Sequence, residues 1–332
     1  MKKHQIALLV LLSVAAAITV ACGNSSNPVY SNMPFNSDRA VTPATGLFTM
    51  SVTGSSVTPV QTGSSNFPWG LSVSADFKTL TYVQNGEVWS VAPGGGTPTQ
   101  LTQNAANNNS SNLSRISPNG RQIVYPVFSN SVESGSIWIM NADGSGSTNL
   151  TPTLPTGMGF CYVASFSADS SMVVFACDGS SDFGLYTVKT DGTQLATVLT
   201  QSTPIDSPAF AANGKQILYV TYGIPGADAH LSVNHAAFVA KVLHRQPQGT
   251  TQLSTTGIAS VNLDGSSPVL MLPATSNQIL ESEVLNSSLY YVMYDSSVNF
   301  NQIFKANLDG SGSASISDGT ADDELGVCAG CN

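Results

Sequence analysis

The feature that most constrains the fold of this chain is a glycine-centred turn between two extended runs, which recurs along the sequence. The best copy reads "IWIMNADGSGSTNLT" over residues 137–151. The other five copies cover residues 47–60, 88–102, 185–200, 258–272 and 303–317. The turn glycines are spaced by roughly 40 to 50 residues apart from one longer gap, and they are Gly54, Gly95, Gly144, Gly192, Gly265 and Gly310. A period of this length indicates stacked or radial units, none of which buries its apolar face alone.

The centre of the best copy has two interpretations, a phosphate-binding loop and the turn of a β-hairpin. A phosphate loop needs a helix behind it, so that the helix N-terminus faces the anion. Residues Ile137 to Met140 predict a strand, but the segment that follows runs into Pro152 and begins no helix. Asp143-Gly144 between two extended runs is a strong short-range hairpin signal. The sequence therefore favours the hairpin.

A second strand pair precedes most of these hairpins. In each copy an apolar residue enters a tight polar turn and a β-branched or aromatic strand leaves it. The copies cover residues 73–84, 116–127, 166–177 and 210–221, with a shortened one at 284–294. Each unit is therefore predicted to contain four antiparallel strands, which is typical of a propeller blade.

The combined pattern "ISPNGRQIVYPV…IWIMNADGSGSTNLT" resembles the repeat of TolB-like β-propellers. The resemblance covers the chain from about Pro28 to the C-terminus. It implies an all-β fold built from four-stranded antiparallel blades. Unlike TolB itself, this chain is expected to lack a separate N-terminal α/β domain.

Five blades are complete in the sequence, and the sixth has to be assembled from both ends of the chain. Residues 28–35, "PVYSNMPF", fit a second strand, and residues 47–60 supply the third and fourth. The first strand is expected from "DELGVCAG", residues 323–330. We therefore predict a six-bladed β-propeller closed by the N- and C-terminal strands in one blade, which removes open sheet edges. It would form one domain over residues 29–332, with an insertion in one blade at about residues 222–256.

The N-terminus has the layout of an exported protein. Two lysines precede an apolar run over residues 6–20, the pattern of a secretory signal peptide. The run leads to Thr19-Val20-Ala21-Cys22, which resembles the lipobox of bacterial lipoproteins. The resemblance implies a signal peptide over residues 1–21, a lipidated Cys22 and a flexible tether to residue 28. It also implies a lipid anchor in a bacterial membrane, the outer membrane facing the periplasm or the cell surface. The alternative is an ordinary signal peptide that ends near a cysteine.

Composition agrees with a place outside the cytoplasm. Charged residues are only 9% of the chain, against about a quarter in typical soluble domains, and Ser, Thr, Asn and Gly replace them. The formal net charge of −9 argues against nucleic acid as a partner, because phosphate binding needs a basic surface.

Four cysteines remain besides Cys22. Cys161 and Cys177 are equidistant from the centre of a predicted turn, so we expect them to face each other across two strands as a disulfide. Two buried thiols are the alternative. Cys328 and Cys331 are expected to form a local disulfide that pins the closing strand, since neither a thioredoxin-like helix nor a second ligand pair for zinc accompanies them.

A search for catalytic residues finds no complete set. The histidines of the mature chain, His230, His235 and His244, lie in the insertion, and their spacing is not that of an i, i+4 metal pair. We expect an amphipathic surface helix over about residues 229–245 there. No Gly-x-Ser-x-Gly nucleophile motif is present. No cofactor is expected, although calcium is an alternative for the Asp-Gly aspartates, which a turn also explains: Asp143, Asp191, Asp264 and Asp309.

Acidic residues gather in the predicted long loops. In a propeller, the loops between second and third strands and the loops between blades lie on one face, and the tight turns lie on the other. Twelve of the twenty acidic residues fall in the first set: Glu133, Asp178, Asp182, Asp206, Asp228, Glu281, Glu283, Asp295, Asp318, Asp322, Asp323 and Glu324. That face is expected to carry a negative potential that favours cations or basic partner surfaces. Plain solubility is the alternative explanation.

Two functions fit these features. The first is a non-catalytic, monomeric binding scaffold on the bacterial envelope, similar in kind to TolB-like propellers, which binds a protein or glycan through its acidic face. The second is a propeller enzyme of the lyase or sugar dehydrogenase type that acts at the central mouth. Such enzymes draw His, Arg or metal-ligating residues from several blades, whereas the histidines here are confined to one insertion and Lys plus Arg total 11. The scaffold is favoured.

Overall fold

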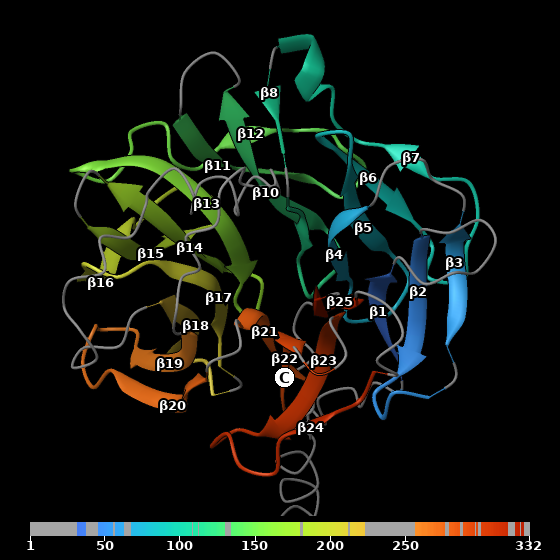
Figure 1. Cartoon of the computed structure of the whole chain (residues 1–332). Coiled ribbons are helices and arrows are strands. Elements are labelled where there is room, and N and C mark those ends of the chain that lie inside the picture. Colours follow the sequence, from blue (N-terminus) through green and yellow to red (C-terminus); the bar gives the residue numbers. More distant parts are fainter. Residues whose placement is uncertain are drawn as a thin grey trace, which may run out of the picture.

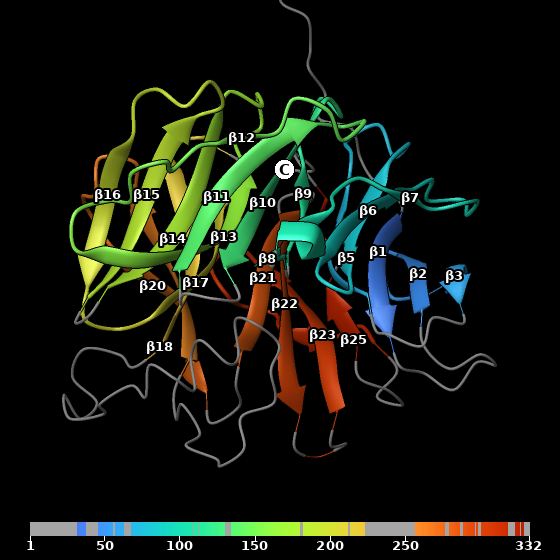
Figure 2. The ribbon, with the colours of Figure 1, turned by 90° about the horizontal axis from the view of Figure 1, so that it is seen from above.

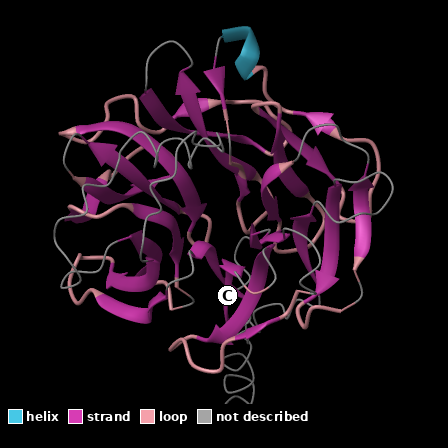
Figure 3. Ribbon diagram, viewed as in Figure 1, coloured by secondary structure: helices cyan, strands magenta, loops and turns pink. Residues whose placement is uncertain are grey.

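The computed structural model describes residues 32–37, 46–62, 68–129, 134–179, 182–222, 256–275, 279–285, 288–317, 323–325 and 327–328, without residues 56, 108, 112, 212, 296, 298 and 299. Within these stretches nearly every ordered element is a strand, and the one helical element is the 3-10 turn η1 (Asn104–Asn107) (Figure 3). The same stretches contain no helix that is both long enough and apolar enough to cross a membrane.

The described strands are short and follow one another along the chain. They are β1 (Asn32–Ser37), β2 (Gly46–Ser51), β3 (Thr58–Thr62), β4 (Trp69–Val73), β5 (Leu80–Gln84), β6 (Glu87–Val91), β7 (Thr99–Gln100), β8 (Asn109–Ser110), β9 (Arg115–Ile116), β10 (Gln122–Ser129), β11 (Ser134–Asn141), β12 (Thr148–Asn149), β13 (Met158–Phe166), β14 (Met172–Gly179), β15 (Phe183–Lys189), β16 (Ala196–Gln201), β17 (Ile205–Phe210), β18 (Gln216–Tyr222), β19 (Thr256–Asn262), β20 (Val269–Thr275), β21 (Ile279–Leu285), β22 (Ser288–Asp295), β23 (Phe300–Asn307), β24 (Ala314–Ser315), β25 (Asp323–Leu325) and β26 (Val327–Cys328).

The sheets are arranged radially around a common centre (Figure 1). β4, β13, β17 and β21 lie near this centre, and β3, β7, β16 and β20 lie at the outside. The sheet orders are β25-β1-β2-β3, β26-β4-β5-β6-β7, β17-β18-β19-β20, β21-β22-β23-β24, and β16-β15-β14-β13-β11-β10-β8 with β9 beside β10 and β12 beside β11. The last sheet is long because β11 and β13 share one parallel pairing, Gly135 with Phe160. The predicted all-β propeller of four-stranded antiparallel units is confirmed, while the count of six blades stays a prediction.

Apolar side chains on both faces of the strands explain why both faces of a sheet are buried. In the β10–β11 pair, Ile123 lies opposite Met140, and both pack with Val83 of the preceding β4–β7 sheet. The next residue along β10, Val124, belongs to the other face and packs with Phe175 of the following β13–β16 sheet. Because successive side chains point to opposite faces, each sheet is wedged between two neighbours. A single unit would leave both faces exposed, as the repeat period predicted.

The hairpin interpretation of residues 137–151 is confirmed. β11 and β12 pair antiparallel, with Trp138 opposite Asn149. The amide of Gly144 donates to the carbonyl of Asn141 over 2.9 Å, and the amide of Asn141 donates to the carbonyl of Ser145 over 2.8 Å. Gly144 has φ +87°. This is a type I turn followed by a left-handed glycine, rather than the two-residue turn that Asp-Gly often marks. The same pair of backbone bonds surrounds Gly54, Gly192, Gly265 and Gly310.

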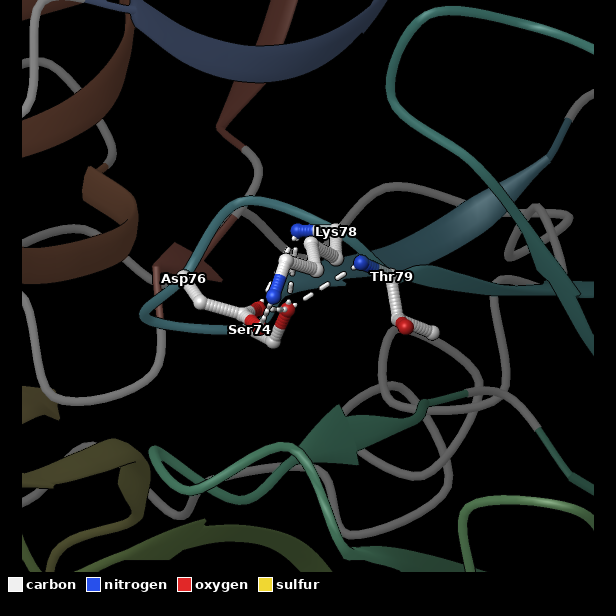
Figure 4. Close-up of polar contacts among 4 residues, drawn as sticks. All are labelled: Ser74, Asp76, Lys78 and Thr79. Atoms are coloured by element: carbon white, nitrogen blue, oxygen red, sulfur yellow. Dashed lines mark hydrogen bonds and ion pairs between the residues drawn. The ribbon is translucent and has the colours of Figure 1, made fainter.

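Three of the turns between first and second strands are held by a serine and an acidic or amide residue two positions later, namely Ser74 with Asp76, Ser117 with Asn119 and Ser167 with Asp169. Ser74 Oγ donates to Asp76 Oδ1 over 2.7 Å and accepts from the amides of Lys78 and Thr79 over 3.3 and 3.1 Å (Figure 4). Asp76 also pairs with the Lys78 ammonium at 3.2 Å. The serine oxygen thus closes the turn from inside, as the Asp/Asn turn signal predicted.

These turns also join neighbouring sheets. The amide of Ala75 donates to the carbonyl of Pro118 over 3.3 Å, and the amide of Asn119 donates to Ser170 Oγ over 3.2 Å. Each bond connects the turn of one sheet to the equivalent turn of the next.

We call the face that carries these turns and the Asp-Gly turns the turn face, and the opposite one the loop face. Figure 2 shows the ring from the side, with the strands running between the two faces.

The predicted disulfide between Cys161 and Cys177 is present. The two residues lie directly opposite each other in the β13–β14 pair, with their Cα atoms 4.0 Å apart, and both are fully buried. Cys328 lies in β26, and its predicted partner Cys331 lies outside the described residues.

The two ends of the described chain meet in one sheet. β25 pairs antiparallel with β1, with Phe35 opposite Leu325 and Ser37 opposite Asp323. β26 continues into the next sheet, where it pairs parallel with β4. A buried cluster that includes Phe35, Phe48 and Tyr290 fills the boundary between this sheet and the β21–β24 sheet. The predicted closure by N- and C-terminal strands is therefore confirmed, but the expected closing strand over residues 323–330 was too long, because only Asp323 to Leu325 pair with β1 and the chain then crosses to β4.

Candidate binding site at the loop face

The innermost strands carry irregularities near the ends that begin at the loop face. Register shifts occur in β4, β13 and β17, where the residues Gly70, Val163 and Ser207 have φ of 56°, 29° and 46°. A left-handed backbone is costly for a β-branched residue such as Val163. Bulges re-aim side chains and are frequent next to functional sites. The recurrence of the bulge in three inner strands therefore marks this end of the ring as a candidate site.

Two predicted acidic residues are brought together beside these bulges. Asp178 lies near the end of β14 and Asp206 near the start of β17, and their side chains are 2% and 7% exposed. The negative charges of both carboxylates are close enough to affect the ionisation of the Tyr162 phenol, which is itself fully buried in β13. Burial first, and then the charges of Asp206 and Asp178, raise the pKa of Tyr162 well above its usual range. The phenol therefore stays neutral and donates to the carbonyl of Ile205 over 2.7 Å.

Aromatic rings connect this acidic pair to the neighbouring sheet. Phe128 of β10 stacks on Phe160 of β13 with the ring centres 4.9 Å apart, and Phe160 lies 6.0 Å from Tyr162 in a tilted arrangement. All three side chains are buried. Phe160 is also the register partner of Asp178, so apolar surface lies beside that carboxylate, and low polarity strengthens the field of a buried charge.

A buried arginine in another inner strand was not predicted as a site residue. Arg115 stands in β9, is 8% exposed, and directs Nη1 at the carbonyls of Ser114 and Leu71, at 3.2 and 3.4 Å. Alignment of the repeats contains the signal that would have revealed it. The residues at the same position, one before the apolar residue that enters the tight turn, are Ser72, Ser165 and Ala209.

The other predicted residues of the acidic face are distributed as follows. Asp182 is exposed in the loop between β14 and β15. Glu281 and Glu283 stand in β21, Asp295 ends β22, and Asp323 and Glu324 stand in β25. Positions outside the described residues are Glu133, Asp228, Asp318 and Asp322, the predicted lipidation site Cys22, and the histidines and predicted helix of the insertion.

The Asp-Gly aspartates act as turn residues. Asp143 Oδ1 accepts from the amide and hydroxyl of Ser145 over 2.9 and 2.6 Å, and Asp264 makes the same two bonds with Ser266. Within the part of the chain that the structure describes, no group of three or more His, Cys, Asp or Glu side chains is placed to hold a metal ion.

The fold and this site define a class of protein, an all-β propeller whose inner strands bring buried acidic and aromatic side chains together at one face. The sequence matches no protein-family model and no curated protein. The structure is similar to the putative TolB from Agrobacterium tumefaciens, with a TM-score of 0.61 and 14% identity over 90% of this chain and 91% of that one. It is also similar to TolB from Acinetobacter baumannii, with a TM-score of 0.65 and 14% identity over 94% of this chain and 70% of that one. The expected TolB-like propeller fold is therefore confirmed.

A third similar structure is an enzyme. It is an oligogalacturonate lyase in complex with manganese, with a TM-score of 0.54 and 11% identity over 86% of this chain and 74% of the lyase. At such identities the likeness shows the fold alone, and function has to be argued from the site.

Proposed function

We propose that this protein is a non-catalytic binding scaffold, lipid-anchored to a bacterial envelope, that binds a basic protein surface through its loop face. The observation that carries the proposal is the burial of Asp178 and Asp206 beside the neutral Tyr162 at that face. Buried carboxylates among aromatic rings produce a lasting negative potential, which draws cationic groups toward the face. The fold shared with TolB from two bacteria supports a role in the envelope.

The partner test compares two sets of carboxylate-to-amide changes that raise the net charge equally. The first set is Asp182→Asn, Glu281→Gln and Asp295→Asn on the loop side. The control set is Asp143→Asn, Asp264→Asn and Asp309→Asn in the turn-face turns, where an amide oxygen still accepts the turn hydrogen bonds. The β22–β23 pair shows that the sets lie at opposite ends, since Asp295 ends β22 and pairs with Phe300, whereas Asp309 follows Asn307, which pairs with Ser288 at the start of β22.

We expect the wild type and the control set to capture a basic partner from cross-linked envelope extracts. The loop-side set should fail to capture it. Binding should also weaken as salt rises. Equal recovery with both sets, or no basic partner with the wild type, would contradict the proposal.

The lyase alternative is favoured by one observation, the likeness to the oligogalacturonate lyase. Its test is incubation of the purified protein with oligogalacturonate and manganese, read by the absorbance of the unsaturated product. The scaffold proposal expects no product, and turnover that follows the protein concentration would replace it with the enzyme.

The lipid anchor has a separate test. Cys22→Ala should release the protein from the membrane fraction into the soluble fraction, because the thiol is the proposed point of attachment. A Cys328→Ala variant is the matched control and should stay with the membrane. Membrane retention of the Cys22→Ala protein would rule out the lipoprotein proposal.

A further inference from the structure

A separate pocket lies on the side of the ring, between the segment that follows β7 and the exposed part of the β10–β11 pair. Its volume is about 230 Å³, and its lining includes Leu101, Gln103, Asn107 and Asn109 from the first segment and Tyr125 and Trp138 from the second. This is below the range of about 300 to 1,000 Å³ that is typical of drug-sized ligands. The pocket therefore suits a single small ring.

The aromatic wall of the pocket is held rigidly. Tyr125 lies opposite Trp138 in the β10–β11 register, so both side chains project from the same face of the sheet. The Tyr125 hydroxyl bonds to Ser147 Oγ at 2.6 Å, and Trp138 Nε1 donates to Ser136 Oγ over 2.9 Å. With its N–H bound to a neighbour, the half-buried indole offers its apolar face to the pocket.

The polar wall of the pocket is built on η1, whose first residue, Asn104, is held by hydrogen bonds to Gly86, Glu87 and Ser111. The amide of Asn104 donates to the buried Glu87 carboxylate over 2.7 Å, and Asn104 Nδ2 donates to Gly86 O and Ser111 Oγ over 3.0 and 2.8 Å. This anchoring fixes the backbone of η1. The side chains of Gln103 and Asn107 on either side are exposed.

The lining has a distinctive chemistry. Each amide side chain combines an acceptor oxygen with two donor hydrogens, which matches a ligand whose hydroxyls both donate and accept. The indole and phenol rings offer flat apolar surface with a negative face, which attracts weakly positive C–H groups. Among the described residues that line the pocket, none is Asp, Glu, Lys, Arg or His. A ligand with a formal charge would find no counter-charge there.

From this combination we infer that the pocket binds one pyranose ring of an uncharged saccharide. The apolar C–H face of the sugar stacks on Trp138, and its hydroxyls bond to the amides of Gln103, Asn107 and Asn109. The inference is independent of the acidic loop face, because the residues that carry it belong to other segments. A small contact of this kind implies weak binding, on the order of millimolar for one ring, which corresponds to about 4 kcal/mol.

The test is calorimetric titration of the purified protein with uncharged gluco-, galacto-, manno- and N-acetylglucosamine oligosaccharides, and with oligogalacturonate as the charged comparison. We expect at least one uncharged sugar to bind and oligogalacturonate to bind at least about tenfold more weakly, a difference of about 1.4 kcal/mol. Trp138→Ala should abolish binding, and Trp138→Phe should retain part of it. Leu270→Ala, which removes a 40% exposed side chain in β20, should leave it unchanged.

A second pair of variants covers the case in which Trp138→Ala does not fold. Gln103→Ala and Asn107→Ala change exposed side chains and should each weaken binding severalfold without changing the melting temperature. The inference is overturned if no uncharged sugar in the panel binds, if oligogalacturonate binds best, or if binding survives both the tryptophan and the amide changes.

Discussion

At the scale of single residues, the turn glycines meet two separate requirements. Gly265 and Gly192 both occupy Asp-Gly turns, with φ of +81° and +82°. A Cβ on Gly265 would collide with the carbonyl oxygen of Val198 in the neighbouring sheet, whereas a Cβ on Gly192 would meet nothing within 4 Å. The glycine thus provides left-handed backbone at every copy, and close approach between sheets at some of them.

This difference predicts unequal effects of alanine. Gly192→Ala should lower the free energy of unfolding by about 1–2 kcal/mol, the cost of a left-handed L-residue. Gly265→Ala should lower it by a further 1–3 kcal/mol or so, because the added methyl group forces the two sheets apart. Urea unfolding of the two variants and the wild type measures the difference. Equal losses would mean that the Val198 contact does not constrain the turn.

The residue two positions after the turn glycine also has left-handed backbone, but it is not glycine in every copy. Gly146 and Gly312 have φ of +66° there, and Gln194 and Ser267 adopt the same conformation at 56° and 52° without being glycine. Gln194 is exposed, so its side chain has little packing to lose.

We therefore expect Gln194→Gly to stabilise the protein by about 0.5–1 kcal/mol. Relief of the left-handed strain, about 1–2 kcal/mol, exceeds the entropy that glycine adds to the unfolded chain. The melting temperature should rise accordingly, and Gln194→Ala, which keeps the strain, serves as the control. A lower melting temperature for the glycine variant would contradict the strain argument.

At the scale of elements, we expect acid to destabilise the tight turns on the turn face that contain Asp76 and Asp169. Hydrogen bonds from Ser167, and then from Ser171, hold the pKa of Asp169 below its usual value, and Ser74 does the same for Asp76. The folded carboxylate thus resists protonation more than the unfolded one. The turns contribute stability that is complete above the unfolded pKa of about 4 and is lost as the pH falls through the lower folded value.

Asn119 occupies the position in its own turn that Asp76 and Asp169 occupy in theirs, so substitutions in both directions are possible. It accepts from Ser117 Oγ over 2.8 Å and from the Arg121 amide over 3.0 Å, yet it does not titrate. Asp169→Asn should flatten the dependence of stability on pH, and Asn119→Asp should steepen it. Urea midpoints between about pH 2.5 and 6 measure both slopes. Unchanged slopes would show that these turns contribute nothing to acid sensitivity.

The elements themselves were largely predictable, for local reasons. Ser-Pro-Asn-Gly and Asp-Gly place turns by side-chain hydrogen bonds and left-handed glycine, and both depend on neighbouring residues only. The type of the Asp-Gly turn was not predictable in the same way. The pairing of Asn141 with Ser145 depends on the register between β11 and β12, and that register is set by packing against adjacent sheets.

At the scale of the whole molecule, the repeat period predicted the propeller and the strand inventory predicted its closure. The candidate site was only partly predictable. The sequence placed Asp178 and Asp206 on the loop side, but it did not reveal their burial, which depends on how the β13–β14 and β17–β18 pairs meet near Tyr162. Arg115 was missed because its signal, a charged residue where other repeats have Ser72, Ser165 and Ala209, appears only when the repeats are aligned with one another.

Closure makes a prediction about the chain end. Removal of residues 322–332 deletes β25 and β26, which pair with β1 and β4. The β1–β3 sheet would lose its inner strand, and buried Met33 and Phe35 would be exposed at an open edge. We expect a loss of several kcal/mol, a large part of the roughly 5–15 kcal/mol that stabilises a typical domain. Thermal unfolding with and without these residues checks this, and matching melting temperatures would mean that closure does not depend on β25.

The pairing of β1 with β25 also has a consequence for biosynthesis. A ribosome makes β1 before β25, with the strands β2 to β24 between them, so the inner neighbour of β1 does not exist until those strands have been made. Until then, Phe35 and Phe48 lack the cover they have in the finished ring. Domains of ordinary connectivity can fold as they emerge, but contacts between the two ends of a chain form late and slowly. Folding of this ring therefore finishes only after β25 has been made, so the apolar side chains of β1 and β2 stay open to other chains for longer than those of the sheets between them.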